Sequence, residues 1–279
     1  MPISKKEYDV TCSLVTYQNT FDDIKQAIDS FLNTDLKIKL FVIDNSPTDT
    51  LKVFGDYNKN IEYIFNNKNV GFGAGHNIAI RKSIELSKCH LILNPDIEYK
   101  KGNLEKLFNH IVENKDIGLI APKVYYQDGS IQYLCRKLPT PFDFFAKRLI
   151  PKLLLPLFQQ QLDEYEFKHF NYDKTIEIPF ISGCFMLIRT DVFSKVGLFD
   201  ENIFMYTEDI DISRRIGKDY KTIFFPEAEV FHGYARESAK NWKLFIISIK
   251  SAIYYFNKWG WFWDKNRAII NNKALNQLK

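Results

Sequence analysis

Short apolar runs alternate with segments of helical spacing along the first 125 residues of the chain. The runs at residues 10–16, 39–44, 61–65, 90–93 and 117–124 have the length and the β-branched content of buried strands. Strands that alternate with helices predict a mostly parallel central sheet, covered by helices on both faces. The pattern therefore indicates an α/β fold.

Three amphipathic helices are predicted between these strands. The first follows Thr20, whose spacing to Asp23 is that of a capping box. The second begins near Gly75 and the third at Asn103. Their apolar residues recur at the intervals of one helix face. These are Phe21, Ile24, Ala27, Ile28, Phe31 and Leu32 in the first, Ile80 and Ile84 in the second, and Leu104, Leu107, Phe108 and Ile111 in the third.

The second half of the chain is less regular. Residues 130–178 contain four prolines and a polar stretch, and they predict an irregular mid-chain insertion with short helices. A strand is predicted at 179–189, a helix from Thr207 to about Lys218, and two short strands at 220–225 and 229–232. We therefore expect a main domain at 1–236, with a first half at about 8–125 and a second half at about 126–236, and a helical, aromatic C-terminal segment at 237–279.

Composition narrows the class of protein. The 279 residues carry a formal net charge of +4 and no dense Lys/Arg run, which argues against nucleic acid as a partner. Four cysteines without a C-x-x-C pair predict reduced core cysteines in a cytoplasmic protein. No signal-peptide stretch is found, and no apolar run reaches the ~18–20 residues that a membrane span needs.

Polar residues follow three of the predicted strands. Thr16 and Tyr17 end the first, Asp44 and Asn45 the second, and 94–96 (NPD) the fourth. The carboxyl ends of parallel strands meet at one edge of a sheet, where ligands bind in folds of this type. We expect these side chains to line a single crevice.

A glycine-rich segment, 69–77 (NVGFGAGHN), lies between the third and fourth strands. Gly71, Gly73 and Gly75 allow a backbone to approach a ligand closely, and the next helix offers its N-terminus to a phosphate. Its spacing differs from the dinucleotide fingerprint. A phosphate-binding loop and a plain turn are equally compatible with the segment.

Two groups of residues are candidates for metal binding and proton transfer. Asp96, two residues after Asn94, suits Mg²⁺ or Mn²⁺, although a capped turn has the same pattern. Glu208 and Asp209 lie in the first turn of a predicted helix, where acidic residues are common and where one of them is also placed to act as a general base. His232 ends the last strand, as a structural residue or as a metal ligand.

In combination these motifs resemble inverting family 2 glycosyltransferases with the GT-A fold, specifically the bacterial rhamnosyltransferase-like branch. The resemblance covers about residues 8–235 in order and spacing. It is carried by 42–46 (VIDNS), 69–77 (NVGFGAGHN), 93–96 (LNPD), 182–189 (SGCFMLIR), 196–211 (VGLFDENIFMYTEDID) and 226–232 (PEAEVFH).

The resemblance implies a role for each candidate residue. Asp209 matches the catalytic base, Asp96 and His232 match the ligands of Mg²⁺ or Mn²⁺, and Glu208 and Asp211 would lie on the acceptor side. The donor nucleotide would contact the residues at the strand ends and in the glycine segment: Thr16, Tyr17, Asp44, Asn45, Gly71, Gly73, Gly75, Asn77 and Asn94.

The resemblance also implies a reaction. It favours transfer of L-rhamnose from dTDP-L-rhamnose, with inversion, onto a lipid-linked or oligosaccharide acceptor in O-antigen-type surface polysaccharide synthesis. A UDP-hexose donor, a non-catalytic nucleotide-sugar or glycan-binding module, and a nucleotidyltransferase are the alternatives. The aromatic, basic tail fits the inner face of the cytoplasmic membrane as well as it fits packing on the domain or in a homodimer.

Two positions depart from the pattern of the branch. Asn94 stands where the D-x-D motif has its first acid, which removes one charge from the expected metal site. After His232, the residues Gly233, Arg236 and Ser238 are spaced differently from the glycine, arginine and serine of the branch.

Overall fold

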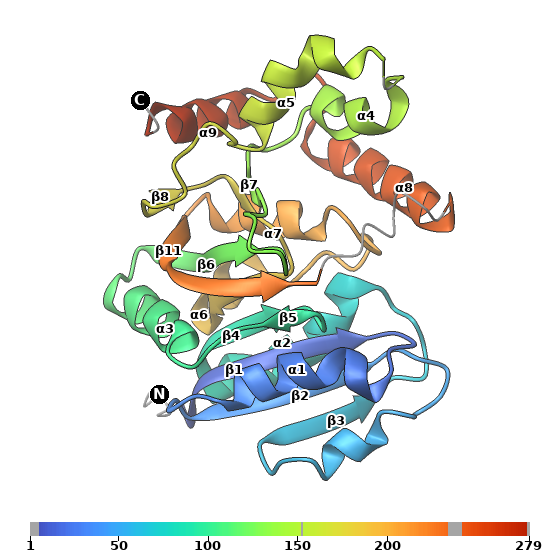
Figure 1. The fold of residues 1–279 in the computed structure, drawn as a ribbon, viewed down its shortest axis with the longest axis vertical. Helices are drawn as coiled ribbons and strands as arrows, with labels where there is room; N and C mark the ends of the chain where they lie inside the picture. Colours follow the sequence, from blue (N-terminus) through green and yellow to red (C-terminus); the bar gives the residue numbers. More distant parts are fainter. Residues whose placement is uncertain (1–5, 152, 234–241, 278–279) are drawn as a thin grey trace.

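The computed structural model describes residues 6–151, 153–233 and 242–277 (Figure 1). A central mixed sheet runs through these residues, and β8 (Ile176–Glu177) adds to β11 outside the main strand order. Its strands lie in the order β3 (Ile61–Phe65), β2 (Ile38–Asp44), β1 (Tyr8–Thr16), β4 (Ser87–Leu93), β10 (Phe185–Arg189), β6 (Ile117–Tyr125), β11 (Lys221–His232) and β5 (Ile97–Glu98).

The sheet is mostly parallel, as predicted. Strands β3, β2, β1 and β4 run parallel to one another, and so do β6 and β11. Strand β10 is antiparallel to both of its neighbours, β4 and β6. Because β10 belongs to the second half of the chain, it joins the two expected halves in one layer.

Helices cover both faces of this sheet (Figure 1). α1 (Phe21–Leu32) and α3 (Asn103–Glu113) lie on one face, and α2 (Phe72–Leu86), α6 (Thr190–Val196) and α7 (Glu208–Ile216) on the other. The predicted capping box starts α1, because Thr20 accepts from the Asp23 amide and Asp23 from the Thr20 amide. A short 3-10 turn, η1 (Lys52–Gly55), precedes β3. The α/β prediction is confirmed.

Two predicted strand boundaries are wrong. Residues 179–189 divide into β9 (Phe180–Ile181) and β10, because 182–184 leave the sheet, and β9 pairs with β7 (Cys135–Arg136). The two strands predicted at 220–225 and 229–232 are one strand, β11 (Lys221–His232), with a register shift between Phe225 and Glu229. Pro226 lies in that shift, where its lack of an N–H removes a ladder hydrogen bond.

The insertion and the tail pack together at one end of the molecule (Figure 1). The insertion contains α4 (Pro141–Leu149), η2 (Leu155–Phe158) and α5 (Gln159–Tyr165), and the tail contains α8 (Trp242–Trp259) and α9 (Lys265–Asn276). Their shared core includes Phe144, Ile210, Ala252, Tyr255 and Phe256. Within the described residues, no helix has both the length and the apolar character of a membrane span.

All four cysteines are buried and free of disulfides, so the prediction of core cysteines is confirmed.

Candidate active site

The first part of the site lies where β1 and β2 end. Thr16 and Asp44 are opposite each other in the parallel register, and both are buried. The Asp44 carboxylate accepts from Tyr63 Oη at 2.7 Å, from Thr16 Oγ1 at 3.2 Å and from the Ser46 amide at 3.0 Å. Tyr63 is a neighbour that the sequence did not indicate, and burial together with Asp44 raises the pKa of its hydroxyl.

Asn45 joins the end of β2 to the glycine segment. Its Nδ2 donates to the Gly71 carbonyl at 3.3 Å, and its Oδ1 accepts from Asn66 Nδ2 at 3.1 Å. Tyr17 lies outside this network, with 48% of its surface exposed. The ends of β1 and β2 therefore combine one exposed aromatic ring, that of Tyr17, with buried side chains that are hydrogen-bonded to their neighbours.

The glycine segment is more helical than predicted. α2 begins at Phe72, so Gly73 and Gly75 lie in its first turns and only Gly71, with φ +91°, lies in the loop. A Cβ at Gly71 would lie 2.4 Å from the Phe204 carbonyl oxygen, and one at Gly73 would lie 2.9 Å from Phe199 Cβ. The glycines thus allow α2 to pack closely against residues 199–208.

Asn77 reinforces the same contact. Its Nδ2 donates to the Phe199 carbonyl and to Glu201 Oε1, each at 2.9 Å, and its Oδ1 accepts from the Phe199 amide at 3.0 Å. Asn77 is fully buried. In this structure it connects α2 to the turn that leads to α7.

Three buried polar side chains, where α2 meets β1 and β4, are linked by hydrogen bonds. Ser13 Oγ is 2.6 Å from His76 Nδ1 and 2.9 Å from His90 Nε2. Burial lowers the pKa of both imidazoles, that of His90 to about 3. Both histidines are therefore neutral, and they stabilise the junction of α2 with β1 and β4.

The second part of the site unites Asp96 with His232. Asp96 follows β4, and His232 ends β11, which pairs antiparallel with β5 directly after Asp96. His232 Nε2 lies 3.2 Å from Asp96 Oδ1 and 3.5 Å from Asn94 Nδ2. The Asp96 side chain is 41% exposed, whereas that of His232 is 5% exposed. A buried nitrogen and an accessible carboxylate thus face each other at the ends of β4 and β11.

This pair fits a divalent cation that keeps other ligands. Among the described residues, no group of three or more His, Cys, Asp or Glu side chains gathers to hold a metal. Mg²⁺ and Mn²⁺ commonly take only one or two protein side chains, together with water and substrate phosphates. A single carboxylate and a single imidazole therefore suit such an ion, provided that a diphosphate supplies further oxygens.

The third part of the site is the first turn of α7. Asp209 accepts from the Gly183 amide at 3.0 Å and from the Ile210 amide at 2.8 Å. Burial raises the pKa of the Asp209 carboxyl to about 6, although these amides oppose the rise. A carboxylate with a raised pKa and a fixed orientation is suited to accept a proton.

Glu208 and Asp211 lie on either side of Asp209 in sequence, in the first turn of α7. Glu208 is buried, and burial and the charge of Asp209 raise the pKa of its carboxyl. Asp211 is fully buried; its Oδ2 accepts from Arg215 Nε and its Oδ1 lies 2.8 Å from both Lys258 Nζ and Trp259 Nε1. The Asp211 carboxylate therefore links α7 to α8.

The break between β9 and β10 holds these parts together. The Cys184 carbonyl accepts from the Asn94 amide at 2.9 Å, while the Gly183 amide one residue earlier donates to Asp209. A Cβ at Gly183 would lie 3.2 Å from the Phe72 ring and 3.5 Å from Asp209 Cβ. Adjacent residues thus hold the loop that precedes Asp96 and the carboxylate of Asp209.

Comparison with protein-family models identifies the family of this chain. The model of "Glycosyl transferase family 2" matches residues 12–197, two thirds of the chain. The chain belongs to glycosyl transferase family 2. It is thus a glycosyltransferase, and the prediction of the family is confirmed.

Curated relatives of this glycosyltransferase include rhamnosyltransferases. It is similar to rhamnosyltransferase WbbL of Escherichia coli (strain K12), with 28% identity over 92% of this chain and 93% of that protein. It is also similar to the N-acetylglucosaminyl-diphospho-decaprenol L-rhamnosyltransferase of Mycobacterium tuberculosis (strain ATCC 25618 / H37Rv), with 23% identity over 81% of this chain and 76% of that one.

Solved structures support the GT-A fold. GalNAc-T7 with UDP, GalNAc and Mn²⁺ matches with a TM-score of 0.60 at 15% identity, over 83% of this chain. This chain spans only 44% of that structure. The mannosyltransferase PcManGT of Pyrobaculum calidifontis, with GDP-Man and Mn²⁺, matches with a TM-score of 0.55 at 14% identity, over 89% of this chain and 65% of that one.

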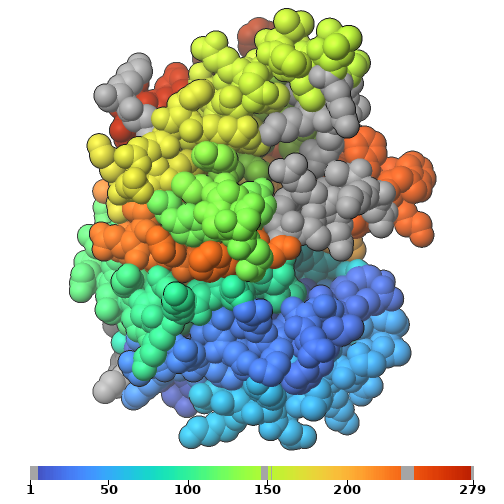
Figure 2. All heavy atoms as spheres, viewed as in Figure 1, coloured from blue at the N-terminus to red at the C-terminus, as the bar shows by residue number. Residues whose placement is uncertain are grey.

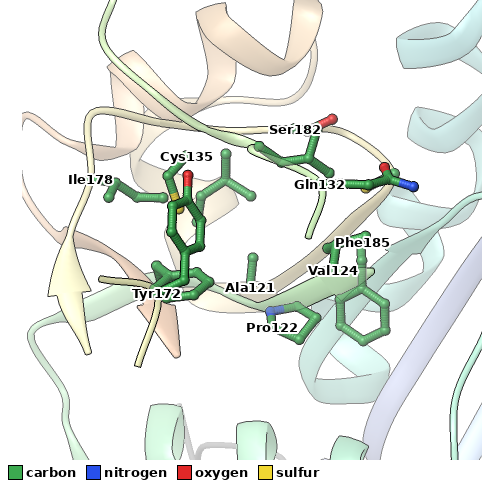
Figure 3. A pocket seen from close by; sticks show the side chains of 13 residues that line it. Ala121, Pro122, Val124, Gln132, Cys135, Tyr172, Ile178, Ser182 and Phe185 are labelled. Carbon is green, nitrogen blue, oxygen red and sulfur yellow. The ribbon is translucent and has the colours of Figure 1, made fainter. Parts of the chain in front are cut away.

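The sequence patterns do not indicate Gln132, which contacts His232, one of the two proposed metal ligands. Gln132 comes from the segment between β6 and β7, which the sequence marked only as irregular. Figure 3 shows Gln132 at one end of a mostly apolar pocket, opposite Tyr172. Only the folded arrangement brings it to His232, 100 residues away in sequence.

Proposed function

We propose that this glycosyltransferase moves L-rhamnose from dTDP-L-rhamnose onto a saccharide hydroxyl, with inversion at the anomeric carbon. The names of the curated relatives support the rhamnosyl donor. The observation that carries the chemistry is the pair of neighbouring contacts at 183 and 184, which hold Asp209 beside the loop of Asp96.

Asp209 is the proposed general base. Its two oxygens are oriented by the Gly183 and Ile210 amides, and its pKa is raised by burial, so it accepts a proton more readily than an ordinary aspartate. Removal of that proton frees the acceptor oxygen for in-line attack on the anomeric carbon. The donor bond to the diphosphate breaks on the opposite side.

Asp96 and His232 are the proposed ligands of the cation, Mg²⁺ or Mn²⁺. A bound divalent ion would offset the charge that grows on the leaving diphosphate. The nucleotide site is proposed to be lined or shaped by the strand-end residues and the glycine segment: Thr16, Tyr17, Asp44, Asn45, Asn94 and residues 69–77. Glu208 and Asp211 are proposed to support the acceptor side indirectly, since both carboxylates are buried.

The acceptor is proposed to be a lipid-linked saccharide of a surface polysaccharide of the O-antigen type, reached at the inner face of the cytoplasmic membrane. One of the relatives is named for a polyprenyl diphosphate-linked substrate. Exposed aromatic side chains between α8 and α9, Phe262 at 76% and Trp263 at 96%, support a membrane contact.

Two experiments test the proposal. Calorimetry compares dTDP-rhamnose with UDP- and GDP-sugars, each with and without Mn²⁺ or Mg²⁺. Metal-dependent binding of dTDP-rhamnose alone is expected. Tight binding of a UDP-hexose would replace the donor and keep the mechanism, and binding to a donor without turnover on any acceptor would favour a non-catalytic module.

The base is tested by Asp209→Asn. The amide cannot accept the proton, so the turnover rate is expected to fall by about 10²- to 10⁴-fold while donor affinity stays close to that of the wild type. Asp219→Asn, an exposed change just after α7, is the matched control. If Asp209→Asn kept most of the activity, the base would have to be another residue.

A further inference from the structure

Gln132 is held in place at the end of β6. Its side chain is buried, with 2% of the residue exposed. Its backbone amide donates to the Val124 carbonyl at 2.9 Å, which fixes the segment beside the strand. Figure 2 shows this segment, in green, lying against β11, in orange. The side chain thus bridges the ends of two neighbouring strands.

Two hydrogen bonds join Gln132 to His232. Gln132 Nε2 donates to the His232 carbonyl oxygen at 2.9 Å, and Gln132 Oε1 lies 3.0 Å from His232 Nδ1. A carbonyl oxygen only accepts, so the amide nitrogen must face it and the amide oxygen must face the imidazole. Because that oxygen also only accepts, Nδ1 must carry a hydrogen.

The position of this hydrogen decides what the other nitrogen can do. In a neutral imidazole with Nδ1 protonated, Nε2 carries the lone pair. In this structure Nε2 faces Asp96 Oδ1 at 3.2 Å, with Asn94 Nδ2 at 3.5 Å. Two electron-pair donors, the imidazole nitrogen and the carboxylate oxygen, then point at the same place, which is favourable when a cation binds between them.

We infer that Gln132 is a positioning residue, which holds His232 in the tautomer whose Nε2 directs its lone pair toward Asp96, where a divalent cation would bind. This inference rests on the proposed metal-dependent transfer. Gln132 does not contact the cation; it acts through the imidazole, as an acceptor for Nδ1–H and a donor to the carbonyl of the same residue. Without it, both tautomers of His232 become accessible.

The variant Gln132→Met tests this, because methionine has a similar length and neither accepts from Nδ1–H nor donates to the carbonyl. Gln127→Met is the matched control, since Gln127 is exposed in the same segment. The first measurement is ¹⁵N NMR of the histidines of the full, metal-free chain, at a pH where the imidazole is neutral. His232→Asn assigns the signal.

The wild type and Gln127→Met are expected to show Nδ1 protonated, and Gln132→Met a mixture that contains the Nε2-protonated form. The second measurement is calorimetry of Mn²⁺ binding in the presence of dTDP. The Mn²⁺ affinity of Gln132→Met is expected to fall by about 10- to 100-fold. Thermal unfolding verifies that each variant is folded.

Gln132→Glu provides a rescue, and keeps the test decisive if Gln132→Met does not fold. At the pH of these measurements the Glu side chain is ionised, and its carboxylate still accepts from Nδ1–H although it cannot donate to the His232 carbonyl. It is expected to restore the tautomer and most of the Mn²⁺ affinity.

Three results would overturn the inference: an Nε2-protonated His232 in the wild type, an unchanged Mn²⁺ affinity in Gln132→Met, or a wild type that binds no Mn²⁺. The last result would also remove the cation from the proposed function. Mn²⁺ binding without rhamnosyl transfer would refute the proposed function alone and leave the role of Gln132 intact.

Discussion

Glu208 is a buried carboxyl directly beside the proposed base. One of its oxygens, Oε2, has no hydrogen-bond partner among the described residues. Burial and the Asp209 charge raise its pKa, so the folded state holds the Glu208 proton more tightly than the unfolded chain does. The stability that this proton contributes is present below the ordinary pKa of Glu and is lost as pH rises through the raised pKa.

The variant Glu208→Gln has no such proton to lose. The difference in free energy of unfolding between Glu208→Gln and the wild type is therefore expected to depend on pH. It should favour the variant more at about pH 9 than at about pH 5, by more than about 1.4 kcal/mol, the free energy of one pKa unit. Urea unfolding at the two pH values measures it. Glu113→Gln, on the exposed side of α3, should show the same difference at both. A pH-independent gain would mean that Glu208 is ionised in the folded protein at both pH values.

Residue types alone did not decide which carboxylates are available. Asp209 and Asp211 are two apart in one helix, so helix geometry alone puts them on different sides of it. The sequence does not show that the Asp211 carboxylate binds Lys258 and Trp259, because those two residues lie in α8, far along the chain. Gln132 escaped notice for the same reason. Partners remote in sequence leave no local pattern.

At the scale of elements, the glycines of 69–77 allow close packing of α2 as well as forming a loop. Gly71 has φ +91° and ψ −179°, a conformation that glycine alone adopts easily. Its amide donates to Asn69 Oδ1 at 3.1 Å, and the next amide, of Phe72, donates to the Phe204 carbonyl. The start of α2 is therefore tied to the segment that precedes the proposed base.

The pair Gly71→Ala and Gly129→Ala separates backbone strain from steric overlap. Both glycines have positive φ, but a Cβ at Gly129 has nothing within 4 Å, whereas one at Gly71 would lie 2.4 Å from the Phe204 oxygen. Gly129→Ala is expected to cost about 1–2 kcal/mol of stability, from strain alone. Gly71→Ala should cost distinctly more and also weaken donor binding. Urea unfolding measures the stability of each variant, and calorimetry measures its donor binding. If the two variants lost equal stability, the turn at Phe204 would be able to move away from the added Cβ at little cost.

Most elements followed from hydrophobic periodicity, because strands buried on both faces have continuous apolar runs. Strand β3 was predicted with its observed bounds, and α1 with its capping residue. The break at 182–184 was not predicted, since its reason is the hydrogen bonds to Asn94 and Asp209. Apolar periodicity continues through it, and only the folded site explains why the ladder stops.

At the scale of the whole molecule, α8 and α9 complete the core around α7. Arg214 and Asp264 form a buried ion pair, with side chains 2% and 4% exposed, and Lys258 pairs with Asp200 and Asp211. Removing residues 237–279 would take these partners away from Arg214, Asp200 and Asp211 and would expose the apolar cluster, so truncation is an unsuitable test of membrane binding. The connection between the two helices, which leaves Phe262 and Trp263 in solvent, is the better place for one.

The double variant Phe262→Ser/Trp263→Ser addresses the membrane contact without disturbing that core. Aromatic rings enter the headgroup region when a basic surface meets an anionic bilayer, and Lys250 and Lys265 are exposed on the adjoining helices. The full chain is expected to bind vesicles that contain phosphatidylglycerol more tightly than vesicles of phosphatidylcholine alone. The double variant should lose roughly tenfold or more of that affinity, since a buried aromatic side chain contributes about 1.5–3 kcal/mol.

Its control is Val53→Ser, which removes an exposed apolar side chain from η1, on the part of the molecule that carries β3 (Figure 1). Co-sedimentation measures binding, and thermal unfolding should be unchanged in both variants because the altered side chains are solvent-exposed. If the wild type bound neither kind of vesicle, the membrane contact would be refuted, and the acceptor would have to reach Asp209 from solution. The exposed rings would then be candidates for contact with a second copy of the chain. Binding lost equally in both variants would place the contact elsewhere on the surface.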